Sequence, residues 1–526
     1  MSLLLACGSP PAGPSASAES SAGGAAEQAE PAIAIGEVHA KIDFTRPGEP
    51  TGDLIGWSLD PATRYAPEGD PLHPEWRTPA RVAAAQALAE TRPGHGRAPL
   101  MRFAAQIDGT RGRDGYHFYR WVDPTHAPAA GDGLASFEAF ALMQDADAAP
   151  IIGLNFGSGT ASEAAAYVRH LNGDDPMDRD VAARLHWGMG QPYRQALFEL
   201  GDASWAADDT GFAATGEFAY ASPTALAGDP AWHGRPSASA ADFAARGLEF
   251  VAAVRAASPP ARLWVPLAPG SMDAWGGVES AAMSLAPLLK DQAITGAAIR
   301  HDLAGDAAAL GWRDPNDPGL RLGGGVELVR PEFRRARAAL DAVRPELPLV
   351  VTEFAVAGGD QASAGLAVAE LLIFYAQVGV AAACQRVALE EVEAAPWLAP
   401  VRLVAEHLLE RSAPIEVVKQ VRKDMSVGTR TIEVPLVHAA AFVDPDGGAG
   451  SLVLLHRDPA AARVLTIDVP EGWTATAGAQ WAPPAPDHDA RRQPIAPEAL
   501  AWAQEGARVQ VTLRPHSLAA LRFAAP

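Results

Sequence analysis

Glu353 is the residue whose type and position point most clearly to chemistry. It follows the apolar run LPLVV and one threonine, and a carboxylate there is costly to bury unless the protein uses it. Arg102, Asn155 and His301 stand at the ends of other short apolar runs. Such side chains can donate and accept hydrogen bonds in a fixed array, which suits a ligand rich in hydroxyl groups. Each also has a structural interpretation: a salt bridge for Arg102, a chain turn for Asn155 and a loop histidine for His301.

The elements that would hold these residues are apolar runs that alternate with helical patterns between residues 51 and 411. The runs cover residues 54–59, 99–105, 149–155, 195–201, 261–267, 295–300, 347–354 and 379–389. Eight strand–helix units predict an α/β fold, a (β/α)8 TIM barrel. The C-terminal ends of barrel strands carry the chemistry, and Glu353 and Arg102 stand at such ends. An open doubly wound sheet is the alternative, but no G-x-G-x-x-G follows the first strand.

The pattern changes near residue 412, where short strands begin to follow one another with Gly, Pro and Asp turns. This change predicts a C-terminal β-sandwich domain over residues 412–526. Residues 33–50 contain a strand pattern with no place in the barrel, so we expect that strand to join the sandwich. The barrel then spans residues 51–411, and residues 1–32 form a tether rich in Ser, Gly, Pro and Ala.

The start of the chain contains LLLAC, which ends at Cys7 and resembles a bacterial lipobox. The tether that follows is the spacer expected between a lipid anchor and a folded domain. A chance apolar start is the alternative, because no basic segment precedes LLLAC. We expect a lipoprotein anchored at the cell envelope on the secreted side, with Cys7 as the lipidated residue. No later stretch has the ~20 apolar residues of a membrane span, so contact with the membrane would be through the anchor alone.

The composition argues against several other partners. The chain has 63 acidic and 42 basic residues and a formal net charge of -21, which repels nucleic acid and anionic membrane surfaces. Its 14 histidines are dispersed, without the H-x-x-x-H or Cys/His spacing of metal sites. We therefore expect no nucleic-acid partner, no metal and no cofactor.

Several segments in order along the chain resemble the barrel glycoside hydrolases that include the α-L-arabinofuranosidases. The most specific is NFGSGT, which begins at Asn155; the others include LMRFAAQIDGTRGRDGYHFY, FELGDASWA, LPLVVTEFAV and LRPHSLAALRF. The resemblance covers about residues 35–526. It implies a retaining hydrolase with a carbohydrate ligand, in which Glu353 is at the nucleophile position. From their positions at the strand ends, Arg102, Asn155 and His301 are the residues that we expect to bind the sugar.

The same resemblance places the family's acid/base glutamate on Ala203, which has no proton to give. Retaining hydrolysis needs two carboxyl groups ~5–5.5 Å apart. Asp202 could supply the second carboxyl group only if the loop turns differently. Glu199 has the correct strand parity but lies ~13 Å deeper in the barrel, so we expect a structural carboxylate there. Trp205, just beyond, could stack on a sugar ring.

Three hypotheses follow. The chain is a glycoside hydrolase that is catalytically impaired or has relocated its acid, or it is a non-catalytic protein of the same fold that binds a glycan or a partner at the cell envelope. The third is a different barrel hydrolase with other catalytic residues. A single lost general acid costs ~10²–10⁴-fold in rate but leaves binding intact, so the sequence supports sugar binding more firmly than turnover.

Overall fold

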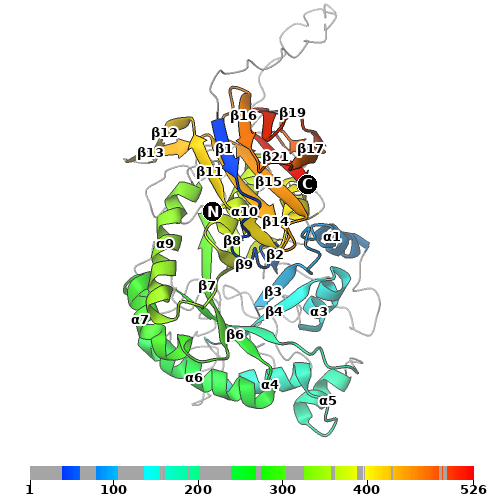
Figure 1. Ribbon diagram of the computed structural model, residues 1–526. Coiled ribbons are helices and arrows are strands. Elements are labelled where there is room, and N and C mark those ends of the chain that lie inside the picture. The colour runs from blue at the N-terminus through cyan, green and yellow to red at the C-terminus, as the bar shows by residue number, and fades with distance from the viewer. Residues whose placement is uncertain are drawn as a thin grey trace, which may run out of the picture.

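The computed structural model (Figure 1) describes residues 38–59, 79–104, 136–154, 156, 160–186, 190–201, 239–267, 274–303, 325–356, 362–387, 392, 395, 397–427, 430–484, 488–489 and 495–526.

Eight parallel strands form a closed barrel. Each strand pairs with the next one along the chain, and β9 returns to pair with β2. The strands are β2 (Gly56–Leu59), β3 (Leu100–Ala104), β4 (Ala149–Leu154), β5 (Leu197–Leu200), β6 (Arg262–Pro266), β7 (Ile294–Asp302), β8 (Leu349–Ala355) and β9 (Val380–Val387). This closure confirms the predicted (β/α)8 barrel and excludes the open doubly wound sheet.

Helices follow the strands and surround the barrel, as the green helices α6, α7 and α9 show in Figure 1. The described helices are α1 (Pro79–Ala89), α3 (Ser136–Asp145), α4 (Ala161–Asn172), α5 (Arg179–His186), α6 (Ala240–Ala257), α7 (Val278–Leu289), α9 (Gly325–Val343), α10 (Ala362–Gln377) and α11 (Leu398–His407). The start of α4 is set by a capping box, in which the Thr160 hydroxyl and the Glu163 carboxylate each accept a hydrogen bond from the other residue's backbone N–H.

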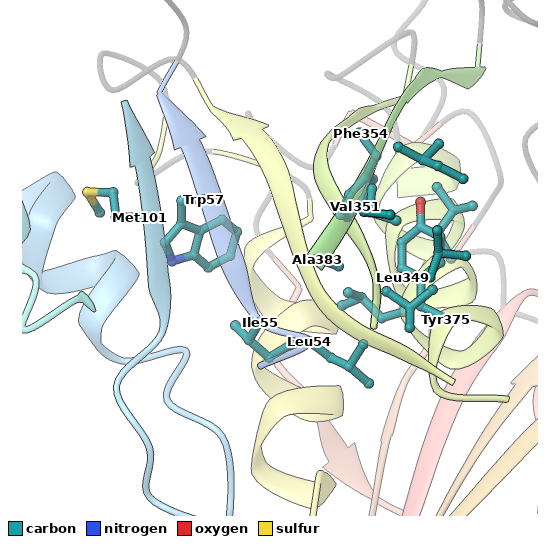
Figure 2. Close-up of a cluster of buried hydrophobic side chains, with 14 of the residues drawn as sticks. Leu54, Ile55, Trp57, Met101, Leu349, Val351, Phe354, Tyr375 and Ala383 are labelled. Carbon is teal, nitrogen blue, oxygen red and sulfur yellow. The ribbon is translucent and has the colours of Figure 1, made fainter. Parts of the chain in front are cut away.

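Strand alternation divides the barrel residues into two layers. One set fills the apolar interior of the barrel: Leu100, Ile151, Trp264, Ala298, Val350, Ala382 and Cys384. The other set packs against the helices, and Figure 2 shows Leu349, Val351 and Phe354 of β8 on the side that faces Tyr375 of α10. Burial in the barrel interior raises the pKa of the Cys384 thiol, so this cysteine is a packed core residue.

Two antiparallel-rich sheets form the β-sandwich. One has the order β11-β1-β16-β20-β19 and the other the order β10-β14-β15-β21-β17-β18. Their strands are β1 (Val38–Ile42), β10 (Arg411–Ala413), β11 (Ile415–Lys419), β14 (Val437–Val443), β15 (Ala449–His456), β16 (Arg463–Asp468), β17 (Thr474–Trp481), β18 (Glu498–Ala499), β19 (Trp502–Glu505), β20 (Arg508–Leu513) and β21 (Ser517–Ala524); β12 (Arg422–Val427) and β13 (Arg430–Pro435) form a separate hairpin. Strand β1 lies between β11 and β16, so this sheet is built from both ends of the chain.

The six-stranded sheet is buried on both faces at its central strands β14 and β15. One face packs against the other sheet through residues such as Leu452, Leu454 and Leu521. The opposite face, with Val453 and Leu455, belongs to the core that includes α10 and α11. The sandwich is therefore joined to the barrel by a continuous apolar layer. No helix in the described part of the chain is both long and apolar enough to cross a membrane.

A buried polar cluster lies within this junction. Glu370 of α10 is fully buried, and its carboxylate pairs with the guanidinium of Arg457, which follows β15. The Nδ1 atom of His438 on β14 is 3.7 Å from the same carboxylate, and its Nε2 is 2.7 Å from Oε1 of Gln377. Because each of these groups would be costly to bury alone, their pairing fixes the position of α10 on the sheet.

Candidate functional site

Charged side chains replace the apolar interior toward the C-terminal ends of the barrel strands. They come from five strands and, with one serine, form a single connected cluster. Its described members are Ser58 (β2), Arg102 (β3), Glu199 (β5), Arg300 (β7), Glu353 (β8) and Arg386 (β9). Because the active sites of TIM barrels are at this end, the cluster is the candidate functional site.

Glu353 is at the centre of the cluster, and both of its carboxylate oxygens are engaged. Its Oε2 accepts a hydrogen bond from the Ser58 hydroxyl at 2.8 Å and lies 3.5 Å from Nη1 of Arg102. Its Oε1 lies 2.7 Å from Nη2 of Arg300 and 2.7 Å from Nη2 of Arg386, whose Nε also donates to it at 3.0 Å. Three guanidinium groups therefore surround one carboxylate.

The side chains of the cluster differ in how far they are exposed to solvent. The side chains of Arg102 and Glu353 are 1% and 4% exposed, whereas those of Arg300 and Arg386 are 19% and 33% exposed. Arg300 and Arg386 are therefore the more exposed partners of the Glu353 carboxylate, and Arg102 is its buried partner.

A shift in the register between two barrel strands turns the Glu353 side chain toward the barrel interior. Between β7 and β8 the register shifts, so that Ile299 faces Val351 but Arg300 faces Glu353. The extra residue on β8 is Thr352, which is the arrangement of a β-bulge. Val351 and Phe354 consequently both point to the helix layer (Figure 2), while Glu353 joins the interior cluster.

Glu199 is the second carboxylate of the cluster. It is 2% exposed and accepts a hydrogen bond from Nε of Arg102. Arg102 therefore bridges the two carboxylates, with Nε on Glu199 and Nη1 on Glu353. The contact agrees with the expectation that Glu199 is a buried, hydrogen-bonded structural carboxylate.

The structure brings two of the sequence-predicted residues together, Arg102 and Glu353. It places His301 elsewhere, which corrects the expected position at the barrel rim. The His301 ring packs beside Phe354, Phe333 and Tyr375 in the helix layer, and its Nε2 contacts the Tyr375 hydroxyl. The reason is strand alternation, because Arg300 takes the inward position on β7 and its neighbour must point outward. Burial lowers the pKa of His301 to about 4, so its imidazole is neutral near pH 7.

The remaining predicted residues lie outside the described part of the chain. They are Cys7, Asn155, Asp202, Ala203 and Trp205. Their roles remain predictions from the sequence.

Sequence reasoning missed Ser58, Arg300 and Arg386. Two signals pointed to the arginines, and none to Ser58. Arg300 stands directly before the selected His301, and Arg386 lies inside the last predicted barrel strand, where an arginine is unusual. Whether Arg300 or His301 points into the barrel depends on the register between neighbouring strands. The sequence alone does not show that register.

A cavity of about 450 Å³ lies at the other end of the barrel. Its lining includes Leu100, Ala149, Leu197 and Arg262, the first residues of their strands. This N-terminal face of a TIM barrel contributes to stability rather than to chemistry, so the cavity is not the candidate site. Among the described residues, no group of three or more His, Cys, Asp or Glu side chains is placed to hold a metal ion.

Comparisons with protein families and with curated proteins found no match to the chain. Solved structures do match. The α-L-arabinofuranosidase from Thermotoga maritima in complex with arabinose has a TM-score of 0.66 at 13% identity, over 92% of this chain and 99% of its own. The GH51 arabinofuranosidase from Xanthomonas axonopodis pv. citri has a TM-score of 0.64 at 17% identity, over 93% of this chain and 100% of its own. A Paenibacillus polymyxa xyloglucanase from glycoside hydrolase family 44 has a TM-score of 0.55 at 11% identity, over 94% of this chain and 100% of its own. The chain therefore shares the fold of solved α-L-arabinofuranosidases along more than nine tenths of its length.

Proposed function

We propose that this protein binds a glycan at the C-terminal end of its barrel and that its capacity for hydrolysis is strongly reduced. The observation that carries the proposal is the surroundings of Glu353. Its two oxygens have contacts from Ser58 and three arginines, and a carboxylate has about four lone-pair sites.

A retaining glycosidase uses such a carboxylate as the nucleophile, which must bring one oxygen to the anomeric carbon. In this protein Oε1 of Glu353 is contacted by both Arg300 and Arg386, and Oε2 is contacted by Ser58 and Arg102. Attack by Glu353 would require at least one of these ion pairs to separate. The site is therefore poorly prepared for nucleophilic attack and well prepared to hold a ligand by hydrogen bonds.

The sequence supports the same conclusion independently. By resemblance, the acid/base position is Ala203, so protonation of a leaving sugar would need another group such as Asp202. A hydrolase with a relocated acid remains the second candidate. The retained Glu353 favours it, and so does the fold that the chain shares with arabinofuranosidases and a xyloglucanase.

The test combines binding with turnover. Arabino-oligosaccharides and xyloglucan oligosaccharides are titrated by calorimetry, and sugar release is then measured over a range of pH. We expect binding without release. An aryl α-L-arabinofuranoside, whose leaving group needs no proton, should react slowly or not at all, and azide should accelerate any such reaction because no base activates water.

Two results would count against the proposal. Release of sugar from the natural oligosaccharides with a bell-shaped pH profile and no azide effect would identify a working hydrolase with a relocated acid. A failure to bind any glycan would exclude a carbohydrate ligand of these classes. Ala203→Glu serves as an internal comparison, since restored hydrolysis in that variant would locate the defect at the acid position.

A further inference from the structure

Arg386, the more exposed of the two outer arginines, has more donors than Glu353 can use. Arg386 directs Nε and Nη2 at the same oxygen, Oε1 of Glu353. A guanidinium has five N–H groups, so the Nη1 atom and the second Nη2 hydrogen of Arg386 remain. Within the described part of the chain, Nη1 of Arg386 has no other partner. These remaining hydrogens form the second edge of the guanidinium plane, which matches the geometry of a carboxylate.

The charge of the cluster points to the same kind of ligand. Among the described residues it contains three guanidinium groups and two carboxylates, and Glu199 pairs with Arg102. Arg300 and Arg386 both contact Oε1 of Glu353. The guanidinium of Arg386 is the more exposed of the two, at 33%, so it presents positive charge toward solvent.

We propose that Arg386, with Arg300 beside it, forms a subsite for the carboxylate of an acidic sugar. The inference rests on the proposed glycan-binding function and narrows its ligand to glycans that contain a uronic acid. Glu353 is then a positioning residue, since it holds both guanidinium groups in place from the buried side. A ligand hydroxyl could use one donor of Arg386, whereas a carboxylate can use two in a charge-assisted pair.

The experiment compares acidic glycans with their uncharged methyl esters. A glucuronic-acid-substituted xylo-oligosaccharide and an oligogalacturonide are each titrated as the free acid and as the methyl ester, at low and at high salt. In the unmodified protein we expect the better of the two acids to bind at least about 10-fold more tightly than its ester. Salt should weaken the acid more than the ester, because Arg386 is partly exposed.

Two variants locate the effect. Arg386→Gln should remove the preference for the acid, and Arg386→Lys should recover only part of it because the planar fork is lost. The control is Arg402→Gln on α11, since Arg402 is also 33% exposed and also paired with a glutamate, Glu90. This control should keep the full preference.

The outcomes separate the inference from the proposed function. Equal binding of acid and ester in the unmodified protein would overturn the acidic subsite and leave glycan binding in place. A preference that survives in Arg386→Gln would also overturn it. Absence of binding by every acidic and neutral glycan would instead overturn the proposed function. The acid–ester comparison does not depend on any variant, so it decides the matter even if Arg386→Gln fails to fold.

Discussion

At the scale of single residues, the partners of a carboxylate decide what it can do. Glu353 and Glu199 face the same interior and share Arg102. Glu199 is held by that deep guanidinium, whereas Glu353 has two further arginines that reach solvent. The contacts of Glu353 are therefore those of an anchor for an arginine cluster.

Glu353→Gln tests that view through stability. Removing the charge leaves Arg102, Arg300 and Arg386 without their shared counter-ion. The loss of a buried partner costs about 3–5 kcal/mol, and we expect about 2–3 kcal/mol here because two of the arginines reach solvent. Urea unfolding of the purified variant measures the change in the free energy of unfolding.

The matched control for this prediction is Glu346→Gln. Glu346 also pairs with an arginine, Arg344, but is 70% exposed, so its replacement should leave the free energy of unfolding nearly unchanged. If Glu353→Gln proved as stable as the unmodified protein, Glu353 would not be an anchor, and the interpretation as a nucleophile would gain support.

At the scale of elements, the barrel interior depends on close contact between neighbouring strands. Gly56 begins β2, and a Cβ atom there would lie 2.8 Å from the Ala383 carbonyl oxygen and 2.8 Å from the Cys384 sulfur. Both atoms belong to β9, the strand that closes the barrel on β2. The absence of a side chain at Gly56 therefore permits the closure of the barrel.

Gly56→Ala should accordingly destabilise the protein by about 1–3 kcal/mol, the usual cost of overpacking a core. Gly190→Ala is the control, because a Cβ at Gly190 meets nothing within 4 Å and should leave stability unchanged or slightly higher. Thermal and urea unfolding of both variants measure the difference. Equal stability of the two variants would mean that β2 and β9 can move apart without cost.

At the scale of the whole molecule, buried histidines link stability to pH. Burial lowers the pKa of His170, His301, His407 and His516 to about 4 in each case. A histidine in the unfolded chain has a pKa near 6.5. Between pH 6.5 and pH 4 these histidines are protonated in the unfolded state but not in the folded state. The free energy of unfolding therefore decreases as the pH falls from 6.5 toward 4.

His301 allows this prediction to be tested at one site. Its shift implies a loss of about 2 kcal/mol between pH 7 and pH 5. His301→Gln cannot titrate, so its free energy of unfolding should decrease by that much less over the same interval. Urea unfolding at the two pH values gives both slopes. Parallel slopes for the two proteins would show that His301 does not contribute to the pH dependence.

The location of the protein is also a property of the whole chain. The prediction of a lipid anchor depends on Cys7 and the tether, which lie outside the described residues. Expressed in a bacterial host, the protein should fractionate with membranes, and Cys7→Ser should release it. If both proteins fractionate as soluble, Cys7 is an ordinary thiol.

The sequence by itself determined the architecture. Alternation of strand and helix patterns depends on local periodicity, so all eight barrel strands and the later β-rich region could be predicted. The two central members of the site, Arg102 and Glu353, could also be predicted, because polar residues at the ends of apolar runs are visible without any knowledge of the fold.

Only the tertiary structure decided which side chains share the site. Arg300 and His301 are adjacent in the sequence, and the pairing of Arg300 with Glu353 across a bulge selects the first and turns the second toward α10. Arg386 joins Glu353 from the neighbouring strand β9. Register and bulges arise from contacts between strands that are distant along the chain, whereas the sequence displays only local periods. For this reason the barrel was predictable and its arginine cluster was not.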